Sequence, residues 1–451
     1  MFCNRRAASA TKFVIILAAL GTAALSQNLP VCSWPLETTG TGITNVAYPD
    51  TNATYWTMPI DTTRWKTVTI TGTYPQSRFF SFVTYVAQGA TVTNGVLNDA
   101  DINPDPNNSN PFRPNPVEGQ PQQYTITASQ TEPSTGGSNF IPLADTRLGW
   151  LIYRIYVPNS GLGRNAGVPL PTITVVDQSG QSRTLSPCRS QKGIGGVESL
   201  IAALGRQRLN QGIGFLRQLI APDNPLPGQT ATCQPTPLVS WIPEHTGGYF
   251  PNPANKYIAI PGLCFQPDRI LVVRGKGAIF PDTFNGNPIW VPSGTQLRYW
   301  SLCNNNQRAP YPVVGCEADH STKLDQDGYY TYVVSESDRG SEGAPSWVPA
   351  DATWLPWGSR RTPNILLMRN MLPVDHFHHT VQAAIDAKCY VDNSNGAPSR
   401  DDIVRGGNCA HVVMRQYYPL AVYCNKQLFI SEGWKGCFAY AKATGQLFSQ
   451  Q

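Results

Sequence analysis

Two carboxyl groups and an imidazole lie close together in the segment Glu317-Ala318-Asp319-His320, directly after Cys316. Carboxyl and imidazole groups are the side chains that most often transfer protons in enzymes. His245 and Arg298 add donors that can stabilise an oxygen as it gains negative charge. The candidate catalytic residues are therefore His245, Arg298, Asp319 and His320.

Aromatic side chains are frequent in the same half of the chain and suggest the wall of a binding pocket. Small-molecule sites are mostly lined by apolar and aromatic side chains with a few polar groups. The alternative is that the tryptophans fill the core and the charged residues are solvated. The candidate substrate-binding residues, which predict a small apolar or aromatic ligand, are Trp241, Tyr299, Trp300, Trp354 and Trp357.

Other chemistries have weaker signals in the sequence. No G-x-S-x-G motif marks a serine nucleophile. In "DHFHH", His376 and His379 are three residues apart, but no third metal ligand is visible and Asp375 suits the start of a helix. "DADINPDPNN" resembles a calcium loop, yet Pro104 and Asn110 replace the glycine and glutamate that such a loop requires. We therefore predict no metal site and no cofactor.

The elements that must position these residues occur twice in the sequence. "SRFFSFV" from Ser77 is matched by "LRYWSLC" from Leu297. Further blocks match in the same order: "ATYWTMP" with "NKYIAIP", "KTVTITGTYP" with "RILVVRGKGAIFP", "YTITAS" with "YTYVVS", "NFIP" with "TWLP", and "WLIYRIYVP" with "ILLMRNMLP". Matches that keep their order at a nearly constant spacing indicate an internal repeat.

The repeated blocks predict a mainly β fold. They are short, rich in Val, Ile, Thr, Tyr and Phe, and separated by Gly, Pro and Asn, as antiparallel strands are. We expect two repeated antiparallel β-sandwich (jelly-roll-like) domains, residues 27–190 and 234–385. A helical apolar stripe from Val197 to Ile220 predicts one amphipathic helix in the connector 191–233, packed between or against the two β units. Residues 386–451 form a Cys-rich tail without a counterpart in the first half.

The repeat also helps to separate architecture from chemistry. Arg298 has a counterpart in Arg78, which favours a structural role in which the guanidinium stacks on an aromatic ring or pairs with a carboxylate. Polar groups that only the second copy carries are better site candidates. These are Glu317, Asp319 and His320, together with the insertion "FPDTFNGNPIW" at 280–290.

The N-terminus and the cysteines predict a secreted protein. Residues 1–26 combine a basic start with an apolar run too short to span a bilayer, as in a signal peptide. Removing Cys3 from the 11 cysteines leaves an even number for disulfides, including a Cys303–Cys316 pair and a group, Cys389, Cys409, Cys424 and Cys437, that staples the tail. Asn52 and Asn107 begin glycosylation sequons. The net charge is +5, and the basic residues are scattered along the sequence rather than clustered. We therefore predict neither a nucleic-acid nor a membrane partner.

Two resemblances extend these predictions. The blocks "NFIP…WLIYRIYVP" and "RFFSFVTY" resemble a broad group of secreted double-β proteins from bacteria and fungi, over most of the mature chain. In length, signal peptide, predicted glycosylation and lack of a cofactor motif, the chain also resembles the fungal secreted hetero-Diels–Alderases of tropolone–sesquiterpenoid biosynthesis. That resemblance implies a cofactor-independent cycloaddition between an o-quinone methide and a terpene such as humulene.

Each function gives the candidate residues a different task. In the cycloaddition, Arg298, His245 or His320 would polarise the enone oxygen, and His320 or Asp319 would assist the loss of water. The first alternative is a secreted polysaccharide hydrolase or lyase that uses carboxyl groups such as Asp282, Glu317 and Asp319. The second alternative is a non-catalytic module that binds a ligand on an aromatic surface.

Overall fold

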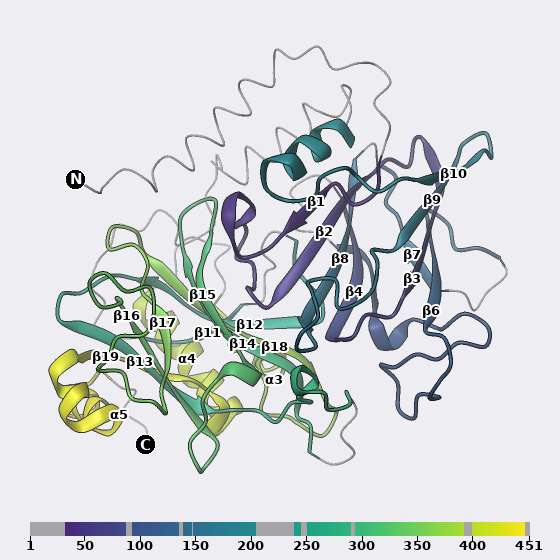
Figure 1. The fold of residues 1–451 in the computed structure, drawn as a ribbon. Helices are drawn as coiled ribbons and strands as arrows, with labels where there is room; N and C mark the ends of the chain where they lie inside the picture. The colour runs from purple at the N-terminus through teal and green to yellow at the C-terminus, as the bar shows by residue number, and fades with distance from the viewer. Residues whose placement is uncertain are drawn as a thin grey trace, which may run out of the picture. The chain divides into compact units, whose positions relative to one another are not determined.

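The computed structural model describes residues 32–86, 93–134, 139–146, 148–203, 239–244, 250–289, 294–391 and 399–446. The chain divides into two compact units (Figure 1). Unit 1 comprises Met1–Pro49, Ala53–Pro222 and Gly248–Pro251, and unit 2 comprises Asp50–Asn52, Asp223–Gly247 and Asn252–Gln451. The predicted signal peptide, the part of the predicted helix after residue 203 and His245 lie outside the described residues.

Unit 1 contains two sheets. One has the strand order β1 (Leu36–Thr38), β2 (Ala53–Ile60), β8 (Gly149–Pro158), β4 (Ser77–Val86) and β5 (Thr93–Asn98). The other has the order β10 (Ser182–Leu185), β9 (Thr172–Asp177), β3 (Trp65–Thr73), β6 (Gln123–Ser129) and β7 (Asn139–Pro142). All pairs are antiparallel except β6–β7. Aromatic rings fill the space between the sheets, and Phe82 and Tyr153 stack at 4.8 Å.

Unit 2 repeats this arrangement. Its sheets have the orders β11 (Ile242–Glu244), β12 (Asn255–Leu263), β18 (Asn364–Pro373), β14 (Leu297–Asn306), β15 (Val313–Ala318), and β17 (Thr353–Pro356), β16 (Tyr329–Ser335), β13 (Arg269–Lys276), β19 (Leu420–Asn425). Only β16–β17 is parallel. One apolar core joins residues of both sheets, among them Leu302 of β14, Val273 of β13 and Tyr423 of β19. The predicted mainly β fold with two repeated β-sandwich units is confirmed.

The duplication reaches single residues. Gly72 of β3 lies against the Tyr124 hydroxyl, and Gly275 of β13 lies against the Tyr330 hydroxyl. A Cβ atom at either glycine would collide with the tyrosine ring, which is fully buried in both units. Glycine is therefore needed at both positions for close packing rather than for a special backbone angle.

The tail does have a counterpart in the first half, contrary to the sequence-based prediction. β19 pairs antiparallel with β13, as β9 pairs with β3, so the tail supplies a strand that unit 1 takes from within its own repeat. The two strands match in place and direction but not in residues, which is why the repeat did not reveal them. The helices of this region are α3 (Val381–Asp386), α4 (Arg400–Met414) and α5 (Lys426–Ala443), the last with a break at Gly433.

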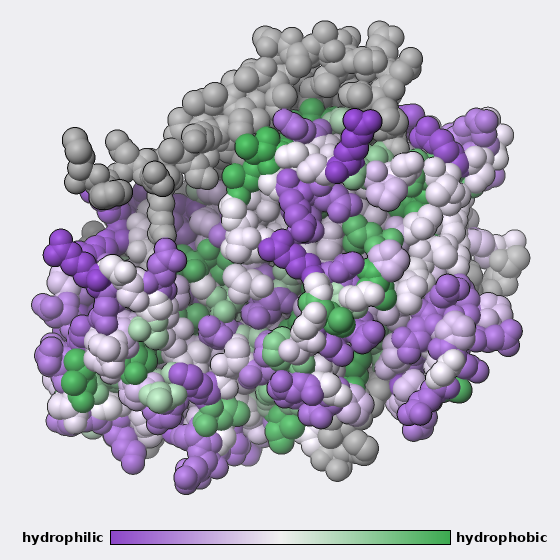
Figure 2. Space-filling model, viewed as in Figure 1, coloured by the Kyte–Doolittle hydropathy of each residue, from purple (hydrophilic) through white to green (hydrophobic). Residues whose placement is uncertain are grey.

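The predicted connecting helix is present where the structure describes it. Residues 193–203 are helical. Leu200 packs on Val83, Trp150 and Ile152, so this helix covers a face of unit 1. No helix among the described residues is long and apolar enough to cross a membrane. On the face drawn in Figure 2, hydrophobic side chains form small separate patches among hydrophilic ones.

Each of the two units contains disulfide bonds. The predicted Cys303–Cys316 bond is confirmed and joins β14 to β15. The predicted tail group forms two bonds, Cys389–Cys409 and Cys424–Cys437. Cys32–Cys188 connects the two ends of unit 1. Cys264 is also disulfide-bonded. Bonds of this kind are typical of proteins in oxidising compartments.

Candidate acid–base site

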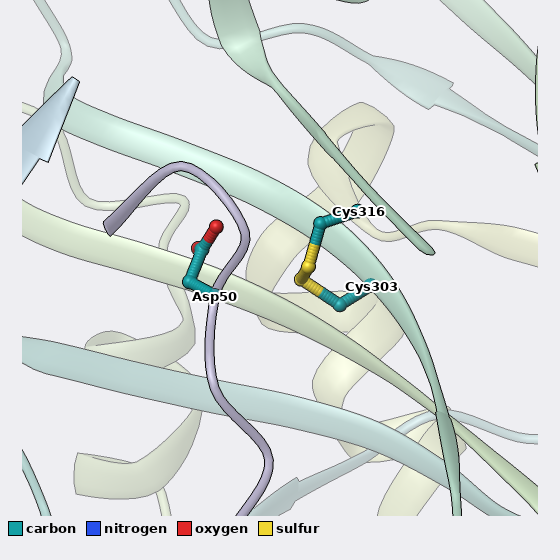
Figure 3. A group of neighbouring side chains, drawn as sticks. All are labelled: Asp50, Cys303 and Cys316. Carbon is teal, nitrogen blue, oxygen red and sulfur yellow. A yellow bond between two sulfur atoms is a disulfide. The ribbon is translucent and has the colours of Figure 1, made fainter. Parts of the chain in front are cut away.

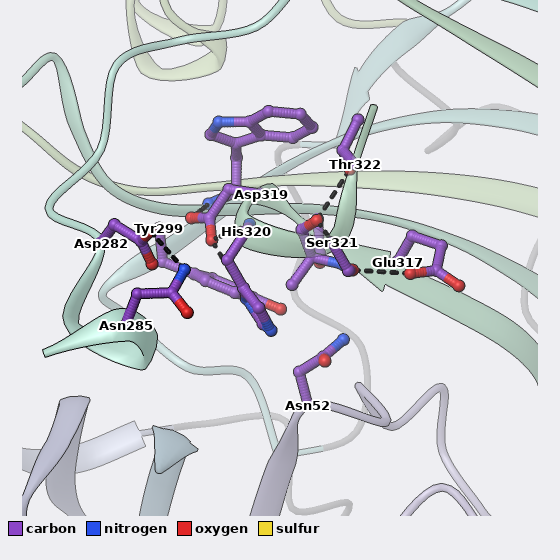
Figure 4. Close-up of polar contacts among 12 residues, drawn as sticks. Asn52, Asp282, Asn285, Tyr299, Glu317, Asp319, His320, Ser321 and Thr322 are labelled. Carbon is purple, nitrogen blue, oxygen red and sulfur yellow. Dashed lines mark hydrogen bonds and ion pairs between the residues drawn. The ribbon is translucent and has the colours of Figure 1, made fainter. Parts of the chain in front are cut away.

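The segment singled out by its sequence folds as the end of β15 followed by a single 3-10 turn, η5 (Asp319–Ser321). Figure 4 shows Glu317, Asp319, His320 and Ser321 gathered around this turn. A second 3-10 turn, η4 (Thr283–Asn285), comes from the predicted insertion, and its Phe284 stacks on His320. We call Glu317, His320, Ser321 and Phe284 the acid–base site.

Asp319 holds the backbone of this turn in place. Its carboxylate is buried and accepts hydrogen bonds from the backbone N–H groups of Trp300, at 3.1 Å, and His320, at 2.8 Å. In unit 1, Asp99 accepts the same bonds from Phe80, at 3.2 Å, and Ala100, at 2.6 Å. The prediction that Asp319 is particular to the second copy is therefore wrong, because the duplicated frame needs a carboxylate at both positions.

The sequence did contain a signal for this equivalence. Asp99 and Asp319 are separated by the same number of residues as Arg78 and Arg298. Arg298, like Arg78, is buried, which fits the structural role that the repeat favoured. Both Asp319 and Arg298 thus belong to the part of the molecule that the two units share.

His320 is particular to unit 2, where it replaces Ala100 of unit 1. Its ring stacks on Phe284 with centroids 4.3 Å apart, and its Nδ1 lies 3.6 Å from the Asp319 Oδ1. The imidazole is 11% exposed. It is therefore oriented by an aromatic ring and a carboxylate while one edge stays accessible to solvent.

Glu317 is the group of this site whose pKa departs from its ordinary value. Burial raises the pKa of its carboxyl above the ordinary value. The hydrogen bond from the Ser321 hydroxyl, at 2.6 Å, and the charges of His320 and Lys323 offset part of that rise. The corresponding residues of unit 1 are Leu97 and Asp101, so this carboxyl–hydroxyl pair is not part of the frame that the two units share, although the Ser321 hydroxyl also accepts a bond from the Ala318 N–H.

Further polar groups surround the site. Asn285 donates a hydrogen bond to Asp282 at 2.6 Å on the neighbouring turn. Figure 4 shows Asn52 facing His320 and Glu317 from the segment Asp50–Asn52, which is attached to β15 by a bond from Thr51 to the Cys316 carbonyl. Asn52 begins a predicted glycosylation sequon, and its amide is half-buried and bonded to Asp50. The second predicted glycosylation residue, Asn107, is exposed.

A second polar centre, which sequence reasoning missed, surrounds Asp50. This fully buried carboxylate accepts hydrogen bonds from Tyr299 and Ser301, both at 2.7 Å, and lies 3.7 Å from Arg369. Figure 3 shows it beside Cys303 and Cys316. These three residues have the spacing of a metal site, but both sulfurs are bonded to each other and do not act as thiolate ligands.

The predicted aromatic residues divide between packing and polar roles. Trp241 and Trp357 are buried in the core between the sheets, as the alternative interpretation held. Tyr299 binds Asp50, and burial together with that charge raises the pKa of its hydroxyl. Trp354 is partly exposed and bonds Ser335. Within the described part of the chain their rings therefore form no common wall, and Trp300 borders a small pocket of unit 2.

Comparisons with known proteins identify no family. No protein-family model matches the sequence, and no curated protein matches it. Among solved structures, an uncharacterised protein from Burkholderia cenocepacia is similar at 14% identity, with a TM-score of 0.48 over 83% of this chain and 88% of the other. A protein from Vibrio parahaemolyticus is similar at 13% identity, with a TM-score of 0.37 over 82% of this chain and 92% of the other.

Proposed function

We propose that the protein is a secreted enzyme that cleaves a polysaccharide by hydrolysis or elimination, with Glu317 and His320 as its proton-transferring pair. The observation that carries this proposal is the difference between the two units. Both build the same turn on an equivalent aspartate, but unit 2 has Glu317, His320 and Ser321 where unit 1 has Leu97, Ala100 and Asp101. Residues that the fold does not need are the ones available for chemistry.

The two groups suit complementary roles. A carboxyl group whose pKa is raised keeps its proton to higher pH and can give it to a leaving oxygen as a general acid. The imidazole of His320, which contacts Phe284 and Asp319, can accept a proton from the substrate or from a water molecule. Ser321 holds the Glu317 carboxyl in one orientation.

The surroundings favour a substrate rich in hydroxyl groups. An amide and a carboxyl side chain, those of Asn285 and Asp282, border the site. Such groups form hydrogen bonds with sugar hydroxyls and bind apolar molecules poorly. The disulfides fit a protein that works outside the cytosol, where polymeric carbohydrates are found.

The cycloaddition stays a prediction. It requires an apolar pocket that holds two substrates in contact. The pocket that Trp300 borders has an inner part with space for about one water molecule. The polar acid–base site is therefore the stronger basis for a function.

The test is a screen of neutral and acidic polysaccharides for new reducing ends and for the ultraviolet absorbance of an elimination product. We expect Glu317→Gln and His320→Ala each to lower kcat by about 100-fold or more, because each removes a proton donor or acceptor. His320→Ala installs the residue that unit 1 carries, so the turn should fold normally.

The matched control is Asp101→Ser, which gives unit 1 the residue that unit 2 has at this position and should leave the rate unchanged. Full activity in both unit 2 variants would overturn the assignment of the pair. Failure to cleave any polysaccharide, combined with a ligand that raises the melting temperature, would instead favour a binding module.

A further inference from the structure

The disulfide between Cys303 and Cys316 lies beside a buried cation. The two cysteines are directly opposite each other in the register of β14 and β15. The Nη1 of Arg369 donates a hydrogen bond to the Cys303 sulfur at 2.7 Å. The guanidinium group therefore contacts one of the two bonded sulfurs.

The fold does not require a covalent link at this place. In unit 1 the equivalent register pair is Val83 and Val96, which join β4 to β5 without a disulfide. Unit 2 has cysteines at both of these positions. Opening the bond should therefore leave β14 and β15 paired, as β4 and β5 are.

The two sulfurs have different surroundings. Cys303 is fully buried, whereas Cys316 is half-buried on β15, the outermost strand of its sheet. The guanidinium of Arg369 lies 3.7 Å from Asp50 and is thus nearer to the Cys303 sulfur than to the carboxylate. Asp50 opposes a second negative charge here, but two side-chain hydroxyl groups donate hydrogen bonds to it and spread its own charge. A thiolate on Cys303 would consequently be stabilised by the neighbouring cation.

We propose that Cys316 is a modification site for low-molecular-weight thiols. The thiolate of such a compound attacks the Cys316 sulfur and forms a new disulfide bond with it. The bond between Cys303 and Cys316 breaks, and its electron pair goes to Cys303, which becomes a thiolate bonded to Arg369. A sulfur that is stabilised as a thiolate leaves faster, which favours this direction of exchange. The exchange uses no side chain of the acid–base site, so it is independent of the proposed polysaccharide chemistry.

The test treats the folded, oxidised protein with reduced glutathione, stops the reaction with acid, alkylates free thiols in denaturant and locates the products by peptide mass spectrometry. We expect glutathione on Cys316 and an alkylated Cys303. These products should form at least about tenfold faster than products at two control disulfides of unit 2.

The two control disulfides separate the effect of the cation from other effects. Cys424–Cys437 spans 13 residues, as Cys303–Cys316 does, but both its cysteines are buried. Cys389–Cys409 joins a buried cysteine to a half-buried one, as Cys303–Cys316 does. Within the described part of the chain, no arginine donates a hydrogen bond to a sulfur of either control.

A second measurement isolates the effect of Arg369 without removing it. Cys316→Ala leaves Cys303 as a free thiol beside the guanidinium. Cys437→Ala is the matched variant, because it leaves Cys424 free among apolar side chains. The thiolate fraction at pH 7, read from ultraviolet absorbance, should be at least about tenfold larger for Cys303 than for Cys424.

The double variant Cys303→Val, Cys316→Val installs the register pair of unit 1 and should fold and give no adduct on β15. Equal exchange rates at the three disulfides would overturn the proposal. So would equal thiolate fractions in the two single variants, or exchange that starts only when the native circular dichroism is lost.

Discussion

At the scale of single residues, the clearest difference between the units is the partner of one buried arginine. Arg154 of unit 1 is bonded to the Tyr85 hydroxyl and the Phe250 carbonyl, which are neutral. Arg369 occupies the same place in unit 2 and faces the charged Asp50 instead. Both guanidinium groups also lie over a tyrosine ring of the neighbouring strand. Unit 2 has therefore replaced a neutral hydrogen-bonded pair with a buried ion pair.

Removing the charge from the Asp50–Arg369 pair should lower the stability of the protein strongly, although the substitution changes few atoms. Asp50→Asn keeps an oxygen for the turn bond to the Asn52 N–H but removes the charge. Arg369 then loses the buried charge of Asp50, and the Tyr299 and Ser301 hydroxyls lose their carboxylate acceptor. We expect the free energy of unfolding to fall by about 3–5 kcal/mol in urea titrations.

Asp177→Asn is the matched control for this substitution. Asp177 accepts similar turn bonds from the Ser179 and Gln181 N–H groups, but it is only half-buried and forms no ion pair with an arginine among the described residues. Its replacement should therefore lower the free energy of unfolding much less. If both substitutions lowered the free energy of unfolding equally, the turn bonds rather than the ion pair would account for the effect of Asp50→Asn.

Glu244 predicts a pH dependence of stability. Burial at the end of β11 raises the pKa of its carboxyl to about 7. The folded state therefore keeps this proton over a pH range in which the unfolded chain has lost it, so stability falls as the pH rises from about 4.5 to about 7. Replacing Glu244 by Gln should remove about 1–3 kcal/mol of the difference between the unfolding free energies at pH 5 and pH 8. An unchanged difference would contradict the burial of this group.

At the scale of elements, β19 is the piece that completes unit 2. It pairs along β13 from Arg269 to Arg274, and its Val422 and Cys424 join a second apolar cluster with α5. Without it, β13 would present an unpaired edge and uncovered apolar side chains. Exposed edges of this kind promote aggregation.

A chain that ends after residue 386 tests the importance of β19. We expect it to be insoluble or to bind a hydrophobic dye strongly, since unit 2 loses both a strand and a helix that covers its sheet. The matched full-length variant carries Cys424→Ala and Cys437→Ala, which removes the bond between β19 and α5 but keeps both elements. A soluble truncated chain with native β-sheet circular dichroism would contradict this role.

The strands could be predicted where the two copies have similar sequences. Strands rich in β-branched and aromatic residues are recognisable from the sequence itself, and the repeat shows each of them twice. Other features leave no such pattern. β9 and β19 share a position but few residue types, and the pairing of Asp50 with Arg369 joins residues far apart in the chain. The tryptophans misled the site prediction, since composition does not tell whether a ring faces the core or a ligand.

At the scale of the whole molecule, the disulfides close loops of very different lengths. Cys32–Cys188 spans 156 residues of sequence, whereas Cys303–Cys316 spans 13. In the chain-entropy account, a longer loop restricts the unfolded chain more.

This difference predicts a ranking of disulfide variants. Replacing both cysteines of the long loop by alanine should cost about 5 kcal/mol, and the same change in the short loop about 3 kcal/mol. Thermal unfolding of the two variants would test this, with protein bearing all its disulfides as the reference. A greater loss from the short loop would show that Cys303–Cys316 acts mainly by holding β14 and β15 in register.

The position of β19 in the sequence also determines when unit 2 can complete its second sheet during synthesis. Every described strand of unit 1 has been synthesised once Leu185 has left the ribosome, so the two sheets of that unit can form early. Unit 2 begins with β11, but β13 lacks its partner on one side until residues 420–425 emerge. During that interval the edge of β13 is open to wrong pairings, and the synthesis of β19 ends this risk.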